Sequence, residues 1–273
     1  MARPSPWLSG NNGNETMSAK ISAFVLAYNS ESQIGTALES LQWVDEIVVI
    51  DSHSTDRTVA IAAEYGAKVV QEDFRGFGRL RNAGIEHTRY DWVFSLDTDE
   101  RCTPEARDEI LRIVDSPDAA DAYHTPRRNF FMGRFIRHGG WYPNYRQPQL
   151  FRRGRLTFPE DDLVHEGFCL DGRLGQMQCA IEQEPFETLS DVLHKANRYS
   201  SLSAEKLARD GRCTGLLGAM THGLGMFFKM YLLRLGFLDG WPGFVIAWSN
   251  LEGTFYKYAK LAELNRKGRK RGE

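Results

Sequence analysis

The chain has 273 residues, 42% of them hydrophobic and 26% charged, which is typical of a soluble globular protein and excludes a collagen-like or wholly disordered one. Its formal net charge of −2 argues against general affinity for nucleic acid. The charge is uneven, because residues 191–273 hold 14 Lys and Arg but 7 Asp and Glu, whereas the preceding residues hold 20 and 29. The two parts are therefore expected to meet different surroundings.

The chain ends and the cysteines bear on compartment and domain organisation. Residues 1–17 lack the apolar core of a signal peptide and predict a disordered leader. The cysteines form no C-x-x-C pair, which predicts neither a zinc site nor a disulfide framework and favours a reducing cytosol. They are Cys102, Cys169, Cys179 and Cys213. We expect a catalytic domain over 18–188 and a basic helical extension over 189–273.

Strands and helices alternate in the first hundred residues. Short apolar runs predict the strands, which are 21–27, 46–51, 67–71 and 91–96. Ser30 with Gln33 has the capping-box pattern for a first helix, Ser54 is expected to cap a second that stops at Gly66, and 78–87 predicts a third. This alternation predicts an α/β fold with a mostly parallel sheet covered by helices on both faces.

The later sequence changes character twice. Thr103 and Pro104 predict the start of a further helix. Beyond Asp121 the chain is rich in aromatic residues, arginine and glycine, which favours an antiparallel or mixed portion with long loops. From about Leu189 the pattern is helical. The apolar stretch 214–238 contains two cations and a histidine, and since a spanning helix needs about 20 nearly uninterrupted apolar residues, we expect it not to cross a membrane.

Polar residues follow the predicted strands where ligands gather in such sheets, at the carboxyl ends. The stretch FSLDTDE places Asp97 and Asp99 there. If strand geometry persists, both side chains project to one side and can bind one divalent cation, although an isolated D-x-D triplet is more often a solvated turn. Mg²⁺ or Mn²⁺ typically takes one or two carboxylates and leaves positions for substrate phosphates, so a diphosphate leaving group is the expected occupant.

Several segments together resemble a known family. VLAYNSES, VVIDSHSTDRT, GRLRNAGI and WVFSLDTDE resemble the inverting family 2 glycosyltransferases with the GT-A fold. RRNFFMGRFIRHGGWYP, LFRRG, VHEG and LHKANRYSS resemble the branch containing lipopolysaccharide inner-core β-glucosyltransferases. The resemblance implies a Rossmann-like sheet with a C-terminal helical extension. It also implies transfer of a hexose from a nucleotide diphosphate sugar, such as UDP-glucose, to a glycolipid acceptor with Mg²⁺ or Mn²⁺.

The same resemblance implies a role for particular residues. The residues expected to bind the nucleotide sugar are Ala27, Tyr28, Asn29, Asp51, Arg81, Asn82, Asp97 and Thr98. The expected metal ligands are Asp97, Asp99 and His194. Glu166 is the expected base, with Asp161 and Asp162 in reserve, and a carboxylate suits removal of a proton from the acceptor hydroxyl. Gly139, Gly140 and Trp141 are expected to bind the acceptor.

Some of these assignments have plain alternatives. His194 is otherwise an ordinary surface or core histidine, and the Gly-Gly-Trp triplet is otherwise a turn with a buried indole. Ser52 stands where many relatives have a second acid, and His53 where glycine is common, which leaves the base of the nucleotide open. The alternative acceptor is a polyprenyl phosphate, which is already ionised and would not require Glu166.

The C-terminal part suggests a surface for a membrane. Lys229 and Arg234 lie among apolar and aromatic residues, and the chain ends near RKGRKR. This pattern indicates a peripheral helix on the anionic cytoplasmic face of the inner membrane. The alternative is a helical cap or a dimer contact with a solvated charged end. No specific nucleic-acid partner is indicated.

The sequence disfavours three other classes of protein. A phosphohydrolase of the haloacid dehalogenase type has its D-x-D on the first strand, whereas three predicted strands precede Asp97 here. A dinucleotide-dependent oxidoreductase needs G-x-G-x-x-G after its first strand, and LAYNSESQIG lacks it. A non-catalytic lipid-associated protein is disfavoured by the retained acidic residues.

Overall fold

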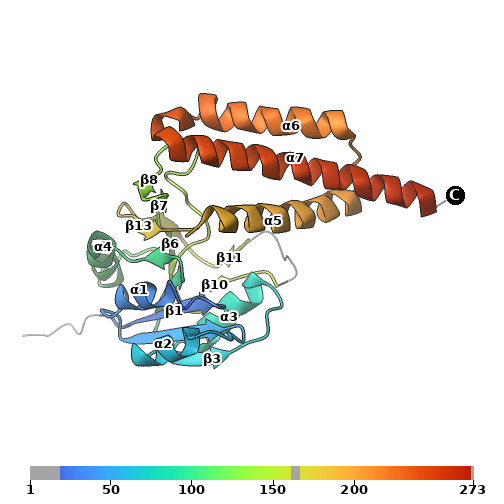
Figure 1. Ribbon diagram of the computed structural model, residues 1–273. Helices are drawn as coiled ribbons and strands as arrows, with labels where there is room; N and C mark the ends of the chain where they lie inside the picture. Colours follow the sequence, from blue (N-terminus) through green and yellow to red (C-terminus); the bar gives the residue numbers. More distant parts are fainter. Residues whose placement is uncertain (1–18, 161–166, 272–273) are drawn as a thin grey trace, which may run out of the picture.

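The computed structural model describes residues 19–160 and 167–271. Its α/β part lies below three long C-terminal helices in Figure 1. The main sheet has seven strands in the order β12-β6-β9-β4-β1-β2-β3. These strands are β1 (Ile21–Ala27), β2 (Glu46–Asp51), β3 (Lys68–Gln71), β4 (Trp92–Asp97), β6 (Ala122–His124), β9 (Leu150–Arg152) and β12 (Leu174–Gln176). The four predicted strands are confirmed, and they pair parallel to one another.

Both faces of the main sheet are covered. Val25 of β1 belongs to the core that packs against α1 (Ile34–Glu39), α2 (Thr58–Glu64) and α4 (Pro104–Val114). Its neighbour Phe24 belongs to the opposite core, against α3 (Phe77–His87). A side chain at Gly84 would begin 2.6 Å from the Phe24 ring, so the glycine allows α3 to lie close to the sheet. The predicted α/β architecture is confirmed.

Helix caps were predicted less well than strands. The helices α1 and α2 begin after Gln33 and Arg57, and neither has a side-chain cap. The expected capping roles of Ser30 and Ser54 are therefore wrong. The Ser30 hydroxyl donates to the carbonyl of Tyr28, and Ser54 donates to the Asp51 carboxylate. The prediction for Thr103 is confirmed, since its Oγ1 accepts from the backbone N of Ala106 at 3.1 Å.

A second, smaller sheet lies beside the end of β4. It has the order β5-β13-β7-β8, from β5 (Glu100–Arg101), β13 (Ile181–Gln183), β7 (Arg127–Phe131) and β8 (Arg134–Phe135). A short antiparallel pair joins β10 (Leu156–Thr157) to β11 (Cys169–Leu170). The mixed portion expected beyond Asp121 is confirmed. Its strand β13 pairs with β5, next to the turn that holds Asp97 and Asp99.

The C-terminal region is helical from residue 189 onward. It consists of α5 (Leu189–Arg209), α6 (Leu216–Phe228), the π-helix η1 (Lys229–Leu233), the 3-10 helix η2 (Gly236–Asp239) and α7 (Gly240–Arg271). A third core joins Phe131 of β7 to Val192 of α5 and Ile246 of α7. The ammonium of Lys260 donates to Asn197, Ser200 and Ser201 and ties α7 to α5. The division at 188/189 stays a prediction.

One described segment is long and apolar enough to cross a membrane by length and composition. It runs from Leu216 to Leu233, with a mean hydropathy of 1.2, and 17% of it is buried. In the structure it packs along α7 and turns back through η1 and η2 (Figure 1). The expectation that it does not span a membrane stays a prediction.

Candidate active site

A cavity of about 650 Å³ opens at the carboxyl ends of β1, β2 and β4. Its volume lies within the range of roughly 300–1,000 Å³ that is usual for small-ligand sites. Five of the predicted site residues line it, and they are Ala27, Tyr28, Asp97, Thr98 and Asp99. The sheet thus brings residues 70 positions apart in the sequence into one crevice.

Asn29 and Asp51 do not line the crevice, but they form hydrogen bonds with the loop at its edge. The buried Asp51 carboxylate accepts from both the backbone N and the hydroxyl of Ser54. Asn29 has a positive φ of 45° and accepts from the backbone N of Thr55 at 2.8 Å. Ser52, which follows Asp51, is the residue of this loop that faces the cavity. The predicted contacts of Asn29 and Asp51 with nucleotide stay predictions.

Arg81 and Asn82 lie on α3 outside the cavity lining. The buried Arg81 guanidinium donates to the two Asp97 carboxylate oxygens at 3.2 and 3.4 Å and to the Ser95 hydroxyl. Asn82 exchanges hydrogen bonds with the backbone of Phe158, at 2.9 Å in each direction. In this structure Arg81 orients Asp97 and Asn82 holds the segment before residue 160, while their contact with nucleotide stays a prediction.

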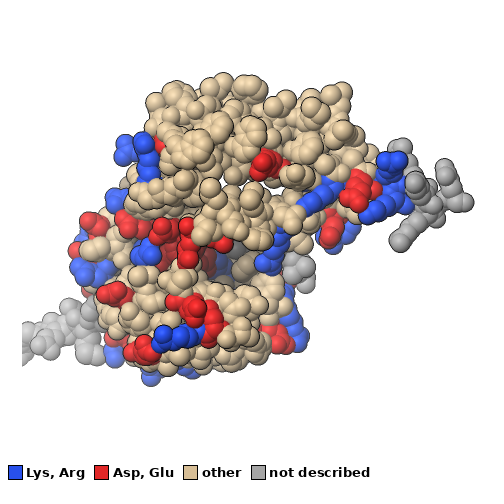
Figure 2. All heavy atoms as spheres, in the orientation of Figure 1, with Lys and Arg blue, Asp and Glu red and all other residues tan. Residues whose placement is uncertain are grey.

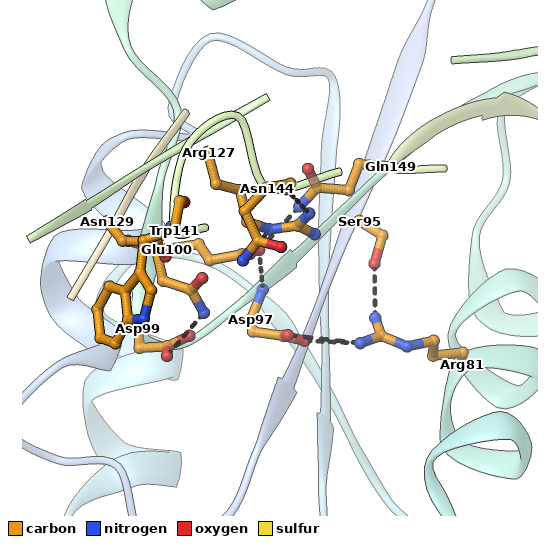
Figure 3. A network of polar contacts seen from close by, with 11 residues as sticks. Arg81, Ser95, Asp97, Asp99, Glu100, Arg127, Asn129, Trp141, Asn144 and Gln149 are labelled. Carbon is orange, nitrogen blue, oxygen red and sulfur yellow. Dashed lines mark hydrogen bonds and ion pairs between the residues drawn. The ribbon is translucent and has the colours of Figure 1, made fainter. Parts of the chain in front are cut away.

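Asp97 and Asp99 are not held by continuous strand geometry. The strand β4 ends at Asp97, and residues 98 and 99 form a turn before β5. The condition under which both side chains were expected to project alike is therefore not met. Figure 3 shows each carboxylate drawn to a different partner, Asp97 to Arg81 and Asp99 to a side-chain amide. That amide belongs to Gln183, whose Nε2 lies 3.0 Å from Asp99 Oδ2.

Glu100 anchors the turn from inside the protein. Its Oε2 accepts from the backbone N of Asp97 at 3.0 Å and from Gln149 at 2.8 Å, and its Oε1 accepts from Arg127 Nε at 2.6 Å (Figure 3). Both Glu100 and Arg127 are 1% exposed, so this is a buried ion pair. Arg127 also donates to the carbonyl of Asn144. The network links the acidic turn to the loop that follows β8.

Three polar side chains of the small sheet lie in register. Gln183 of β13 pairs with Glu100 on one side and with Asn129 on the other. Directly paired residues of neighbouring strands point to the same face of a sheet. Gln183 donates to Asp99, and Asn129 donates to the Trp141 carbonyl at 2.7 Å. The sequence analysis did not predict this alignment of Glu100, Gln183 and Asn129, because the strands that carry them are separated by up to 80 residues.

The electrostatics at Asp99 favour a bound cation. Burial, and then the negative charges of Glu100 and Asp97, raise the pKa of Asp99 to about 7. A cation beside such a carboxyl would favour its ionised form. Two carboxylates with space for phosphate oxygens fit the oxygen-rich ligand set that Mg²⁺ and Mn²⁺ prefer. Asp97 and Asp99 are therefore the residues that would hold the metal.

His194 is placed differently from the prediction. It is exposed on α5, and its Nδ1 lies 3.3 Å from the hydroxyl of Ser190. Over residues 19–160 and 167–271 no group of three or more His, Cys, Asp or Glu is placed to hold a metal. The structure does not bring His194 to the acidic pair, and its role as a ligand stays a prediction.

The site contains residues that the sequence analysis did not select. Arg198, one helical turn beyond His194 on α5, lines the crevice, as do the aromatic side chains of Phe74 and Phe77. The rings of Phe74 and Phe77 meet edge to face, with centroids 5.3 Å apart. The position of Phe74 and Phe77 just after the third predicted strand could have marked them. Arg198 lies in the LHKANRYSS segment and has the charge expected near a diphosphate.

The Gly-Gly-Trp loop is packed against the C-terminal region. Gly139 and Gly140 have φ of 66° and 83°, and a side chain at Gly140 would begin 2.2 Å from the Arg234 guanidinium. The space beside Gly140 is thus filled by Arg234 and is not open to a sugar in this structure. Trp141 is half-buried and lines a second, smaller cavity. The acceptor roles of all three residues stay predictions.

The expected base and its reserves lie outside the described residues. Glu166, Asp161 and Asp162 belong to 161–166. The described residues on either side are Glu160 and Gly167, and Asn82 donates to the Glu160 carboxylate at 3.2 Å. The role of Glu166 as base therefore stays a prediction.

The mostly parallel sheet and the acidic pair at its carboxyl edge define an α/β enzyme of the GT-A class. The sequence profile of Glycosyl transferase family 2 matches residues 22–170, and the chain belongs to this family. It is a glycosyltransferase, as the resemblance predicted. This family match favours the transferase over the phosphohydrolase and oxidoreductase alternatives.

Individual relatives match nearly the whole chain. The lipopolysaccharide core biosynthesis glycosyltransferase LpsC of Rhizobium meliloti is 26% identical over 263 residues, 90% of this chain and 95% of LpsC. An uncharacterized glycosyltransferase of Rickettsia bellii is 27% identical, over 92% of this chain and 89% of its own. A crystal structure of S. aureus TarS 1-349 is 19% identical with a TM-score of 0.48, over 91% of this chain and 92% of the crystallised chain.

Proposed function

We propose that the protein is a metal-dependent inverting hexosyltransferase that moves a sugar from a nucleotide diphosphate donor, in the first place UDP-glucose, to a glycolipid acceptor such as the lipopolysaccharide inner core. The observation that carries the proposal is the pair Asp97 and Asp99 at the wall of a nucleotide-sized crevice, with the half-buried Asp99 beside the negative charges of Glu100 and Asp97. The acceptor class is supported by the similarity to LpsC over 90% of the chain.

Different residues of the crevice would bind different parts of the donor. Tyr28, Phe74 and Phe77 offer aromatic surface for the base at one side of the crevice. Asp97 and Asp99 would hold Mg²⁺ or Mn²⁺, which supplies positive charge to the leaving diphosphate. Arg198 brings a second cation to the same cavity from α5. Positive groups fixed where charge develops lower the barrier without reorganisation.

Glu166 completes the proposed reaction as the base. It takes the proton of the acceptor hydroxyl while that oxygen attacks the anomeric carbon, and the bond to the diphosphate breaks on the opposite face, which inverts the configuration. Replacing Glu166 by Gln should abolish transfer and spare donor binding. Near-normal turnover of Glu166→Gln would instead favour a polyprenyl phosphate as the acceptor.

A donor screen by thermal shift tests the donor and the metal together. We expect one nucleotide diphosphate sugar to raise the melting temperature in the presence of Mn²⁺. We expect this stabilisation to disappear in Asp99→Ala and to persist in Glu184→Gln, a matched removal of a carboxylate whose partner Arg101 is partly exposed. Equal stabilisation of Asp99→Ala by the donor would contradict the proposed metal site.

We further propose peripheral association with the cytoplasmic face of the inner membrane. Large apolar side chains are exposed on the chain from α6 through η1 and η2 into α7, and together they are here called the apolar surface. They are Leu216, Leu217, Met220, Leu224, Phe228, Leu232, Leu233, Leu235, Phe237, Leu238, Trp241 and Trp248. Within 216–251 the sole acidic residue is Asp239, which is buried against His138, whereas Lys229 and Arg234 are exposed. Trp248 also donates its indole N–H to Glu252 at 3.0 Å, so an acidic group lies at one edge of this surface. Exposed apolar side chains with Lys229 and Arg234 among them suit an anionic lipid leaflet.

A further inference from the structure

A second cavity, of about 260 Å³, lies between α5, α7 and the loop of Trp141. It adjoins the crevice, because neighbouring residues face the two spaces. Pro185 lines the crevice and Phe186 the second cavity, and on α5 Arg198 lines the crevice and Tyr199 the second cavity. Segment 185–186 and helix α5 therefore border both cavities.

The lining of the second cavity combines aromatic faces with small polar groups. Trp141 and Tyr199 offer flat apolar surface, and Ser203, Asn250 and Thr254 offer hydroxyl and amide groups. Sugars present both kinds of surface, since ring C–H groups pack on aromatic faces while hydroxyls need hydrogen-bond partners. The volume lies just below the usual range of roughly 300–1,000 Å³ for ligand sites, which limits the occupant to about one monosaccharide.

The charge of the second cavity is positive. Lys195 and Lys257 line it, and no Asp or Glu does among the described residues. The Lys195 ammonium lies 4.9 Å from the ring centre of Phe186, and that of Lys257 lies 4.6 Å from Tyr258. Within the described ranges neither lysine forms an ion pair with a carboxylate, in contrast to Lys267 on the same α7, which pairs with Glu263 at 2.6 Å. Two cations at the wall of one cavity make that cavity attractive to an anion.

We propose that this second cavity binds the acceptor sugar and that the acceptor carries an anionic substituent, a phosphate or a carboxylate, which Lys195 and Lys257 contact. The inference rests on the proposed function, to which it adds the charge and size of the acceptor.

The test uses the full chain without donor or metal. Glucose, glucose 6-phosphate and glucuronate share one ring and differ at carbon 6, and inorganic phosphate lacks the ring. Ligand-observed NMR titrations give the affinity of each. A charged contact discriminates by about tenfold or more, so we expect at least one of the two anionic sugars to bind about tenfold more tightly than glucose. Glucose 6-phosphate or glucuronate as the tighter ligand identifies phosphate or carboxylate as the substituent.

Variants assign the binding to this cavity. We expect Lys257→Gln and Lys195→Gln each to weaken the anionic sugar about fivefold to tenfold, and Thr254→Leu to fill the cavity and weaken all three sugars, while Lys267→Gln binds like the wild type. Melting temperatures check that each variant is folded.

Several outcomes overturn the proposal. They are equal affinity for glucose and both anionic sugars, unchanged binding in Lys257→Gln, and binding of inorganic phosphate as tight as that of the sugar phosphate. Because donor and metal are absent, such a failure leaves the proposed transferase reaction untouched. Conversely, if no donor stabilised the protein in the thermal-shift screen, the sugar affinities measured here would be unaffected.

Discussion

The α/β part and the C-terminal helices differ in the side chains that they bury and expose. In the α/β part, the acidic turn is fixed by buried partners such as Arg81, Glu100 and Gln183. The helices instead leave apolar side chains in solvent, and Figure 2 shows the surface over α6 and the adjoining part of α7 mostly free of charged atoms. The contrast separates a region that fixes polar side chains in place from one whose exposed apolar side chains are proposed to contact lipid.

The largest expected effect comes from breaking the buried network. Glu100→Ala leaves Arg127 charged and buried, which typically costs about 3–5 kcal/mol. The control Glu184→Gln removes a partly exposed partner of Arg101 and should cost less than about 1 kcal/mol. Urea denaturation of both variants measures the difference. Equal stability of the two variants would show that the turn does not depend on this pair.

The apolar surface offers the second test. Replacing both Leu217 and Leu233 by Ser removes side chains that are 75% and 80% exposed, so folding should be little affected. Each buried leucine contributes about 1.5–3 kcal/mol on transfer from water, so binding to phosphatidylglycerol vesicles should fall at least tenfold. Leu174→Ser, 46% exposed on β12, is the matched control in the α/β part. Vesicle flotation reports the bound fraction, and equal flotation of all three proteins contradicts membrane association.

The contact between the two regions can be tested at one glycine. Gly140 and Gly154 both have φ of 83°, but only Gly140 faces another side chain, Arg234. Alanine strains the backbone equally at both positions, so the difference between Gly140→Ala and Gly154→Ala isolates the contact. Displacing a flexible arginine should cost about 1 kcal/mol more at Gly140. Identical thermal stability of the two variants would mean that Arg234 moves aside without cost.

The smallest effect concerns pH. The pKa of Asp99 is raised by burial from 3.8 to about 7, so between these values the folded protein holds a proton that the unfolded chain releases. This contribution to stability is therefore lost as pH rises through that window. With a chelator present, the melting temperature of the wild type should fall relative to Asp99→Asn between about pH 4 and pH 7. Parallel curves would show that Asp99 titrates normally.

Local sequence determined the strands and their order of succession. The runs 21–27 and 46–51 were predicted to the residue, because strands buried on both faces are continuous apolar segments. The family also followed from sequence, since its motifs are short and local. The helix caps predicted at Ser30 and Ser54 were wrong, because the helices begin after Gln33 and Arg57.

Only the tertiary structure decided which partners the site residues have. Gln183, Arg127 and Arg198 approach the acidic turn from 27 to 101 residues away, and no periodicity in a single sequence reports such pairings. The same limit applies to Gly140, whose open side is occupied by an arginine 94 residues later. Apolar periodicity records burial along one element, whereas hydrogen bonds between distant strands and helices exist only after the layers have packed.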